Sequence, residues 1–149
     1  MRSTKLKGKI ALVTGAGQNI GRSIALDLAV SGATIIVNGR NDEALVFDTV
    51  KEIEKNGGSA KGFMADISDP EAVGRMMDNI EKEYGGLDIL VCNAGLRRQT
   101  PFLDMSFIEW REILSVALDG AFLLTKAAVP LMIKRGRGSI VGLSGISHH

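Results

Sequence analysis

Short apolar runs alternate along this chain with longer amphipathic segments. Residues 10–13 are apolar without interruption, which is typical of a parallel strand covered on both faces. Five such segments fit strands, at residues 10–13, 34–38, 60–65, 87–93 and 139–144. Segments with helical start and stop signals separate them, and this alternation predicts an α/β fold.

Successive parallel strands in α/β proteins are joined by right-handed crossovers in nearly all cases. Applied to the five strand segments, this rule predicts a doubly wound parallel sheet of strand order 3-2-1-4-5, with helices on both faces. Ligands bind such sheets outside the carboxyl ends of the strands, where the strand order reverses. We therefore expect a binding crevice beside the first and fourth strands.

The predicted helices begin and end at residues that commonly terminate helices. Asn41 can cap the second helix, which stops at Gly57. Ser68 and Glu71 form a capping box for the third helix, which ends at Gly85. These signals place helices in the crossovers that the strand pattern requires.

A longer helix is predicted after the fourth strand. Ser106 and Glu109 form a second capping box, and the helical pattern continues to about Lys134. Residues 116–129 are apolar on almost every side, so this helix should be buried on more than one face. The covering surface is either the rest of the domain or a second copy of the chain, and we expect a homo-oligomer formed through residues 107–134.

Composition narrows the class of protein. At 149 residues the chain fits one domain, and a domain of this size buries roughly two-thirds of its unfolded surface. Eighteen Lys and Arg residues nearly balance seventeen Asp and Glu residues, which gives no charge pattern for nucleic acid or an anionic membrane. Small molecules are therefore the expected partners, and no metal site is predicted.

Two further features favour a cytoplasmic location. The apolar run after the basic N-terminus breaks at Gly15, which is too short for a signal segment or a membrane span. A single cysteine, Cys92, allows no internal disulfide and fits a reducing compartment. Its apolar neighbours favour a buried thiol within a strand.

The turn between the first strand and the first helix carries the clearest functional signal. Gly15 and Gly17 allow a sharp turn and a close approach of the backbone to a ligand, and Gly21 lets the helix lie near the strand. The N–H groups and the positive dipole end of that helix face the turn, where they can bind an anion. Glycines also cluster in ordinary loops, but the strand, turn, helix and strand in this order favour dinucleotide or nucleotide binding.

Four segments, taken in order, resemble the short-chain dehydrogenase/reductase family. They are residues 14–21 (TGAGQNIG), Asp66 with Ile67, residues 93–95 (NAG) and residues 138–144 (GSIVGLS). Together they are much more specific than any one of them, and members of that family are considerably longer than this chain. The resemblance implies that residues 1–149 form a single Rossmann-like dinucleotide-binding domain that lacks the C-terminal part of the full fold.

The resemblance implies a role for each matched residue. Asp66 would accept a hydrogen bond from the adenine amino group beside the backbone of Ile67, although the same carboxylate could help to cap the next helix. Asn93, Ala94 and Gly95 would pass close beneath the cofactor ribose. The residues implied to hold the pyrophosphate are Thr14, Gly15, Gly17, Gln18, Asn19, Ile20 and Gly21.

The end of the second strand predicts which nicotinamide cofactor is bound. A carboxylate at this point binds the ribose 2′-hydroxyl of NAD and repels the 2′-phosphate of NADP. The chain has Asn38, Gly39 and Arg40 there instead. A charge-assisted contact from Arg40 is worth about 1.5 to 3 kcal/mol, or roughly ten- to hundredfold in affinity. We therefore predict NADP(H) over NAD(H), with Asn38 and Arg40 as binding residues; the alternative is an ordinary surface arginine.

Three positions depart from the family pattern. Asn19 replaces a glycine of the turn, and asparagine is the residue next best suited to a positive φ. Ala117 stands where the family places an asparagine that supports a proton-relay water, so this relay must differ or be absent. Gly145 aligns with the catalytic serine, which leaves Ser144 as the candidate for polarising a substrate carbonyl.

The family's general acid is a tyrosine in a Tyr-x-x-x-Lys motif, and these 149 residues contain no such pair. Tyr84, the only tyrosine, is expected to pack or to face solvent at a helix end. His148 and His149 could donate a proton or bind a metal, but terminal histidines are usually inert. Loss of a general acid costs about 10²- to 10⁴-fold in rate, so we expect an incomplete or truncated enzyme.

The expected function is hydride transfer between NADP(H) and a carbonyl or alcohol substrate, such as a 3-oxoacyl compound or a ketone. A second hypothesis is a catalytically silent nucleotide-binding or regulatory protein, which Ala117, Gly145 and the missing Tyr/Lys pair favour. A methyltransferase on a related sheet would require an acidic residue at the end of the second strand. Asn38, Gly39 and Arg40 argue against this third class.

Overall fold

The computed structural model describes residues 4–144. Their strands are β1 (Ile10–Val13), β2 (Thr34–Gly39), β3 (Ser59–Met64), β4 (Ile89–Cys92) and β5 (Ser139–Gly142). Their helices are α1 (Asn19–Val30), α2 (Glu43–Lys55), α3 (Pro70–Tyr84), α4 (Phe107–Leu114) and α5 (Gly120–Lys134). A short 3-10 turn (Phe102–Asp104) precedes α4, and a π-helical segment (Ser115–Asp119) joins α4 to α5. All the predicted strands and helices are therefore present, with shifted boundaries.

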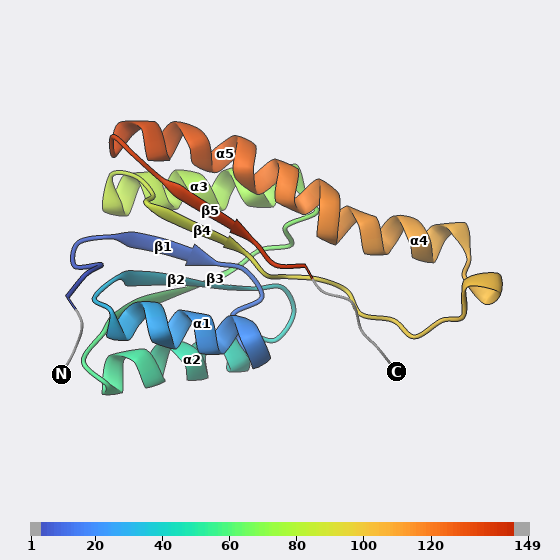
Figure 1. The fold of residues 1–149 in the computed structure, drawn as a ribbon, viewed down its shortest axis with the longest axis horizontal. Coiled ribbons are helices and arrows are strands. Elements are labelled where there is room, and N and C mark those ends of the chain that lie inside the picture. The colour runs from blue at the N-terminus through green and yellow to red at the C-terminus, as the bar shows by residue number, and fades with distance from the viewer. Residues whose placement is uncertain (1–3, 145–149) are drawn as a thin grey trace.

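The strands form one parallel sheet of order β3-β2-β1-β4-β5, which confirms the predicted order. Leu12 of β1 lies beside Ile36 of β2 and Leu90 of β4. Helices α1 and α2 cover one face of the sheet, and α3 and α5 cover the other (Figure 1). Cys92, at the end of β4, is half-buried rather than fully buried. Because every strand is parallel, the carboxyl ends share one edge, and the loops after β1 to β4 meet there.

The core consists of two apolar layers, one on each side of the sheet. Successive residues of β1 belong to different layers, because strand side chains point alternately to opposite faces. Leu12 packs with Met76 and Leu124 beneath α3 and α5, whereas Val13 packs with Val46 beneath α1 and α2. Each fully buried aliphatic side chain contributes roughly 1.5 to 3 kcal/mol. Because both of its faces are packed, the sheet holds the loops at its carboxyl edge in fixed positions.

Two helix starts differ from the sequence prediction. Helix α2 is capped by Asp42, whose carboxylate accepts a hydrogen bond from a first-turn N–H at 3.1 Å, and not by Asn41. Helix α3 is capped by Asp69 and not by Ser68. Ser68 is engaged elsewhere, since its hydroxyl and its N–H both donate to Asp66. At both helices a carboxylate occupies the cap, where it also interacts favourably with the helix dipole.

Ser106 caps the N-terminus of α4, as predicted. Ser106 Oγ accepts a hydrogen bond from the Glu109 N–H at 3.1 Å. The Glu109 carboxylate is engaged elsewhere, because it accepts a hydrogen bond from the Thr100 hydroxyl at 2.6 Å. By length and composition, the helical stretch Phe107–Lys134 could cross a membrane, a property that it shares with buried helices of soluble proteins.

The π-helical segment and α5 have one buried side and one exposed side, whereas α4 has no buried residue. Leu124 and Ala128 are fully buried in the core layer that includes α3. On the outer side, Leu118, Phe122 and Ile133 are 63%, 62% and 72% exposed. The expected burial on more than one face is therefore not found within residues 4–144 of a single chain, which leaves the outer side open to a second molecule.

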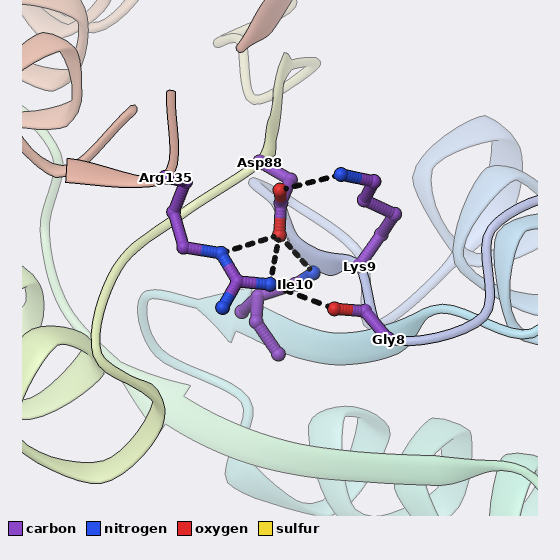
Figure 2. Close-up of polar contacts among 5 residues, drawn as sticks. All are labelled: Gly8, Lys9, Ile10, Asp88 and Arg135. Carbon is purple, nitrogen blue, oxygen red and sulfur yellow. Dashed lines mark hydrogen bonds and ion pairs between the residues drawn. The ribbon is translucent and has the colours of Figure 1, made fainter. Parts of the chain in front are cut away.

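At the opposite edge of the sheet from the carboxyl ends, Asp88 joins three segments of the chain (Figure 2). Its carboxylate, 4% exposed, accepts hydrogen bonds from Lys9 Nζ at 3.0 Å, the Ile10 N–H at 2.9 Å and Arg135 Nη2 at 3.0 Å. Arg135 also donates to the Gly8 carbonyl oxygen at 2.8 Å. Burial by itself would raise the pKa of Asp88, but these donors and the charge of Arg135 hold it below its ordinary value.

Candidate functional site

A cleft of about 580 Å³ opens at the carboxyl edge of the sheet. The loops that follow β1 to β4 form its walls, where the strand order places a ligand crevice. It brings together most of the residues predicted to bind a cofactor, namely Gly15, Gln18, Asn19, Ile20, Gly21, Asn38, Arg40, Asp66, Ile67, Asn93, Ala94 and Gly95. Gly39, Ala65, Arg97 and Val116 complete the lining. Thr14 and Gly17 lie behind this surface.

Close packing between the turn after β1, the first turn of α1 and the loop after β4 requires glycine at two positions. Gly15 has a φ of +62°, and a Cβ on it would lie 3.0 Å from the Ala94 Cα. A Cβ on Gly21 would collide with the carbonyl oxygen of Gly15 and the side chain of Asn93. A side chain at either position would push the turn away from the loop after β4. The two glycines therefore keep bare backbone at the cleft.

Asn19 adopts the left-handed conformation, as expected for the residue that replaces a turn glycine. Its φ is 51°, and it is the only non-glycine residue with a positive φ between residues 4 and 144. Asparagine tolerates this region better than most side chains. The turn thus keeps the course that a glycine would allow, and Asn19 lines the cleft.

Helix α1 differs from α2, α3 and α4 because no side chain caps its N-terminus. Asp42, Asp69 and Ser106 cap α2, α3 and α4, whereas Gln18, the N-cap residue of α1, makes no side-chain hydrogen bond to its helix. The first turn of α1 also contains no acidic residue. The first N–H groups of α1 and the positive end of its dipole therefore lie at the cleft with no carboxylate of their own helix to satisfy them, and such an arrangement binds anions.

Thr14 ties the loop after β1 to the loop after β4. It is fully buried, and its Oγ1 accepts hydrogen bonds from the Asn93 and Ala94 N–H groups, each at 3.1 Å, and donates to the Val91 carbonyl oxygen at 3.3 Å. Asn93 Nδ2 donates to the carbonyl oxygens of Thr14 at 3.0 Å and Gly15 at 3.2 Å. Thr14 therefore shapes the cleft from behind, and its own side chain does not face a ligand.

Gly17 lies on the side of the turn that faces α2. A Cβ on it would lie 3.1 Å from the Leu45 Cβ. The hydroxyl of Thr49, a fully buried residue of α2, donates to the Gly17 carbonyl oxygen at 3.3 Å and to the Leu45 carbonyl oxygen at 3.1 Å. Thr49 thus supports the turn from α2. Only the polar character of a residue on the buried side of a helix could have indicated it from the sequence.

Asp66 and Arg40 face each other across the cleft end formed by β2 and β3. Arg40 Nη1 lies 3.6 Å from Asp66 Oδ2, so Arg40 is not an isolated surface arginine. Asp66 Oδ1 also accepts hydrogen bonds from the Ser68 hydroxyl at 2.6 Å and the Ser68 N–H at 2.9 Å. Partial burial would raise the pKa of Asp66, but the Ser68 bonds and the charge of Arg40 lower it overall. Asp66 is therefore an ionised acceptor at neutral pH.

Asn38 has its side chain turned into the sheet. The residue is 1% exposed, and its Nδ2 donates to the carbonyl oxygens of Gly39 at 3.3 Å, Phe63 at 3.1 Å and Ala65 at 3.2 Å. Its own carbonyl oxygen accepts a hydrogen bond from the Ala16 N–H at 2.9 Å. Asn38 therefore joins β2 to the end of β3 and to the turn after β1, so its amide nitrogen is already engaged within the protein.

The residues considered for catalysis do not line the cleft or fall outside the described part of the chain. Ser144 is exposed and is not among the residues that line the cleft. Ala117 is also exposed, whereas the adjacent Val116 lines the cleft. Tyr84 is half-buried at the far end of α3, as expected for a packed residue, and burial together with Glu83 raises its pKa. Gly145, His148 and His149, for which roles were considered above, lie outside the residues that the structure describes.

Comparison with known proteins identifies the family. The sequence profile of the short chain dehydrogenase family matches residues 9–148, and the chain belongs to this family. It is 39% identical over 142 residues to a 3-oxoacyl-(acyl-carrier-protein) reductase from Aquifex aeolicus. It is 35% identical over 138 residues to a 2-dehydro-3-deoxy-D-gluconate 5-dehydrogenase from Formosa agariphila. These matches cover 95% and 93% of this chain but 57% and 52% of the relatives, so the chain spans about half of their length.

Solved structures of the same class share the fold. A metagenomic short-chain oxidoreductase in complex with NADP matches with a TM-score of 0.90 and 33% identity, over 96% of this chain and 65% of that one. A short chain dehydrogenase from Burkholderia cenocepacia in complex with NADP matches with a TM-score of 0.85 and 33% identity, over 93% of this chain and 56% of that one. The Rossmann-like fold expected from the sequence is thereby confirmed.

Proposed function

We propose that the protein binds NADP(H) and transfers a hydride between it and a carbonyl or alcohol substrate, such as a 3-oxoacyl compound or another ketone. The observation that carries the proposal is the N-terminus of α1, which lies at the cleft without a capping side chain, beside bare backbone at Gly15 and Gly21. A diphosphate at this point would accept hydrogen bonds from the first N–H groups of α1. Two similar structures are complexes with NADP, and one relative is named a 3-oxoacyl reductase, which supports the proposal.

In this proposal, different residues of the cleft bind different parts of the cofactor. The cofactor supplies or accepts the hydride, and the protein binds and orients it. Backbone N–H groups of residues 18–21 bind the diphosphate. Asp66 accepts a hydrogen bond from the adenine amino group, because its carboxylate is ionised at neutral pH. Thr14 holds the Asn93 and Ala94 N–H groups, and so positions the backbone that passes beneath the nicotinamide ribose.

Arg40 supports a preference for NADP(H) over NAD(H). Its guanidinium lies at the end of β2 and is 42% exposed, so it can reach a 2′-phosphate without leaving the cleft wall. Because solvent and Asp66 weaken its charge, we expect the Arg40→Ala variant to lose only about tenfold in NADP⁺ affinity, at the lower end of the range for a charge-assisted contact. Its NAD⁺ affinity should stay within about twofold of the wild type.

Calorimetric titration of both cofactors into the wild type and the variant tests this preference. Arg75→Ala is the matched control, because Arg75 is an exposed arginine of α3 that pairs with Glu71 and does not line the cleft. Equal affinity of the wild type for NAD⁺ and NADP⁺ would contradict the preference.

Cofactor binding without turnover is a second candidate function. It is favoured by Ala117, which stands where the family has an asparagine that supports a proton-relay water. NADPH oxidation by the chain in the presence of a panel of ketones and 3-oxoacyl thioesters separates the two functions. Turnover supports hydride transfer, with Ser144 as a candidate for polarising the carbonyl. Tight NADPH binding without oxidation supports the silent function.

We also propose that the chain self-associates through the outer side of the π-helical segment and α5, within residues 107–134. Leu118, Phe122 and Ile133 form an exposed apolar row there, on a helical stretch whose other side is fixed in the core. Exposed apolar surface of this kind is covered in stable proteins by another molecule, and a second copy of the chain is the simplest partner.

A further inference from the structure

We propose that Arg97 determines substrate specificity by binding the carboxylate of a carbonyl substrate, so that the preferred substrates are small oxo acids. The inference rests on the proposed function, because it takes the cofactor to lie in the cleft. Arg97 lines that cleft but belongs to none of the segments that resemble the nucleotide-binding motifs. It stands two residues after Gly95, in the loop that leads from β4 to α4.

This loop is held to α4 at two residues that follow Arg97, namely Arg98 and Thr100. Arg98 Nη2 forms an ion pair with Glu112 Oε2 at 2.6 Å. The Thr100 hydroxyl donates to Glu109 Oε1 at 2.6 Å. Glu109 and Glu112 are three residues apart on α4, so they present neighbouring anchoring points on one side of the helix. The two consecutive arginines therefore differ. The charge of Arg98 is paired with Glu112 of α4, whereas Arg97 lines the cleft.

Arg97 also carries the uncompensated charge of the cleft lining. The charged residues that line the cleft are Arg40, Asp66 and Arg97. Arg40 and Asp66 lie 3.6 Å apart and largely offset each other. Arg97 takes part in no ion pair or side-chain hydrogen bond within residues 4–144. A guanidinium stays ionised at any physiological pH, and its planar fork matches a carboxylate in a bidentate pair.

The position of Arg97 assigns this charge to the substrate and not to the cofactor. If the diphosphate lies at the N-terminus of α1 and the adenine near Asp66, the other half of the dinucleotide crosses residues 93–95. Arg97 follows these residues in the loop that leads to α4, and the buried, apolar Val116 belongs to the segment directly after α4; both line the same cleft. They offer one cation and one apolar wall, which suit a small molecule with a carboxylate and a carbonyl carbon chain.

Equilibrium binding to the chain saturated with NADP⁺ tests the inference without depending on turnover. The probes are matched pairs of an oxo acid and its neutral amide: pyruvate with pyruvamide, acetoacetate with acetoacetamide, and levulinate with levulinamide. Dihydroxyacetone phosphate and dihydroxyacetone form a further pair that tests a phosphate in place of a carboxylate. The variants are Arg97→Ala and Arg97→Lys, with Arg75→Ala as the control because Arg75 lies outside the cleft.

We expect the wild type to bind at least one acid roughly ten- to hundredfold more tightly than its amide, as a charge-assisted pair predicts. Arg97→Ala should remove this preference, leave amide binding unchanged and change NADP⁺ affinity by less than about twofold. Arg97→Lys should restore part of the preference, since it keeps the charge but loses the fork.

Three results would overturn the inference. If every acid and its amide bound equally to the NADP⁺-loaded wild type, the protein would have no preference for a carboxylate. If only the phosphate pair showed a preference, the group bound by Arg97 would be a phosphate and not a carboxylate. A loss of NADP⁺ affinity in Arg97→Ala as large as the loss of acid binding would make Arg97 a cofactor residue. Failure of the wild type to bind NADP⁺ at all would instead overturn the proposed function, so the two failures are distinguishable.

Discussion

At each of the two edges of the sheet, a few residues form a hydrogen-bond network that joins β1 to β4. At the edge away from the cleft, the Asp88 carboxylate gathers donors from β1 and from the turn after α5 (Figure 2). At the cleft edge, Thr14 and Asn93 join the loops after β1 and β4 through their side chains. Both networks fix β1 against β4, the pair of strands between which the strand order reverses.

Replacement of Asp88 should make stability depend less on pH. The folded-state pKa of Asp88 lies below its ordinary value, so its contribution is complete above the unfolded-state pKa of about 3.9 and is lost as the pH falls through the lower folded value. Asp88→Asn should therefore be less stable by about 1.5 to 3 kcal/mol at neutral pH, and the difference should narrow below about pH 4.

Urea unfolding of the wild type and Asp88→Asn across this pH range measures the effect. Asp48→Asn, which removes an exposed carboxylate from α2, is the control. A stability difference that stays constant down to the acid end of the range would mean that the Asp88 carboxylate contributes by shape alone.

The residues that could be predicted from the sequence are those whose role depends on local backbone. The positive φ of Asn19 followed from its place in a glycine turn, and the structure confirms it at 51°. Asn38 was assigned to the cofactor, but its amide is bonded to the end of β3, a partner that no local pattern reveals. Thr49 and Arg97 were missed for the same reason, because their positions depend on how α2 and the loop after β4 pack.

At the scale of secondary structure elements, the N-terminus of α1 is left without a side-chain cap, which favours anion binding at a cost in helix stability. Helices α2, α3 and α4 satisfy part of their N-termini with their own side chains, whereas α1 does not. Strands and helices were predictable because apolar spacing is a local signal. The exact caps were less so, since Asn41 and Asp42, and likewise Ser68 and Asp69, are adjacent residues of similar capping ability.

The Gln18→Asp variant should be more stable than the wild type but should bind NADP⁺ more weakly. An aspartate at the N-cap would bond the first N–H groups of α1 and stabilise the ligand-free protein by about 0.5 to 2 kcal/mol. The same carboxylate would occupy the anion site and repel the diphosphate, so NADP⁺ affinity should fall by roughly tenfold or more. Thermal unfolding and NADP⁺ titration of the variant measure both effects. Unchanged or tighter NADP⁺ binding would show that the N-terminus of α1 is not the phosphate site.

The whole molecule presents two surfaces with different consequences. One is the cleft at the carboxyl edge of the sheet, which brings together loops from four strands. The other is the outer side of the π-helical segment and α5; α5 lies on the face of the sheet opposite α1 and α2 (Figure 1). The sequence predicted the sheet order because crossover handedness leaves few alternatives. The sequence does not reveal what covers the helical stretch 107–134. Which of its sides is exposed depends on how it packs against the rest of the core, and this packing is not a local property of the sequence.

A charge on the outer side of α5 should break self-association. Phe122→Asp places a carboxylate within the apolar row, so we expect the apparent mass in light scattering to fall from an oligomer to a monomer. Phe47→Asp is the matched control, because Phe47 is similarly exposed, at 54%, but belongs to α2, a helix on the other face of the sheet. A monomeric wild type, or equal dissociation by both variants, would contradict the proposed interface.

A crystal structure of the chain grown with NADP⁺ tests the central claim most directly. The account predicts diphosphate oxygens within about 3 Å of the backbone N–H groups at the start of α1, between the turn at Gly15 and the loop at Ala94. A diphosphate bound elsewhere on the folded protein, with the N-terminus of α1 left to solvent, would contradict it.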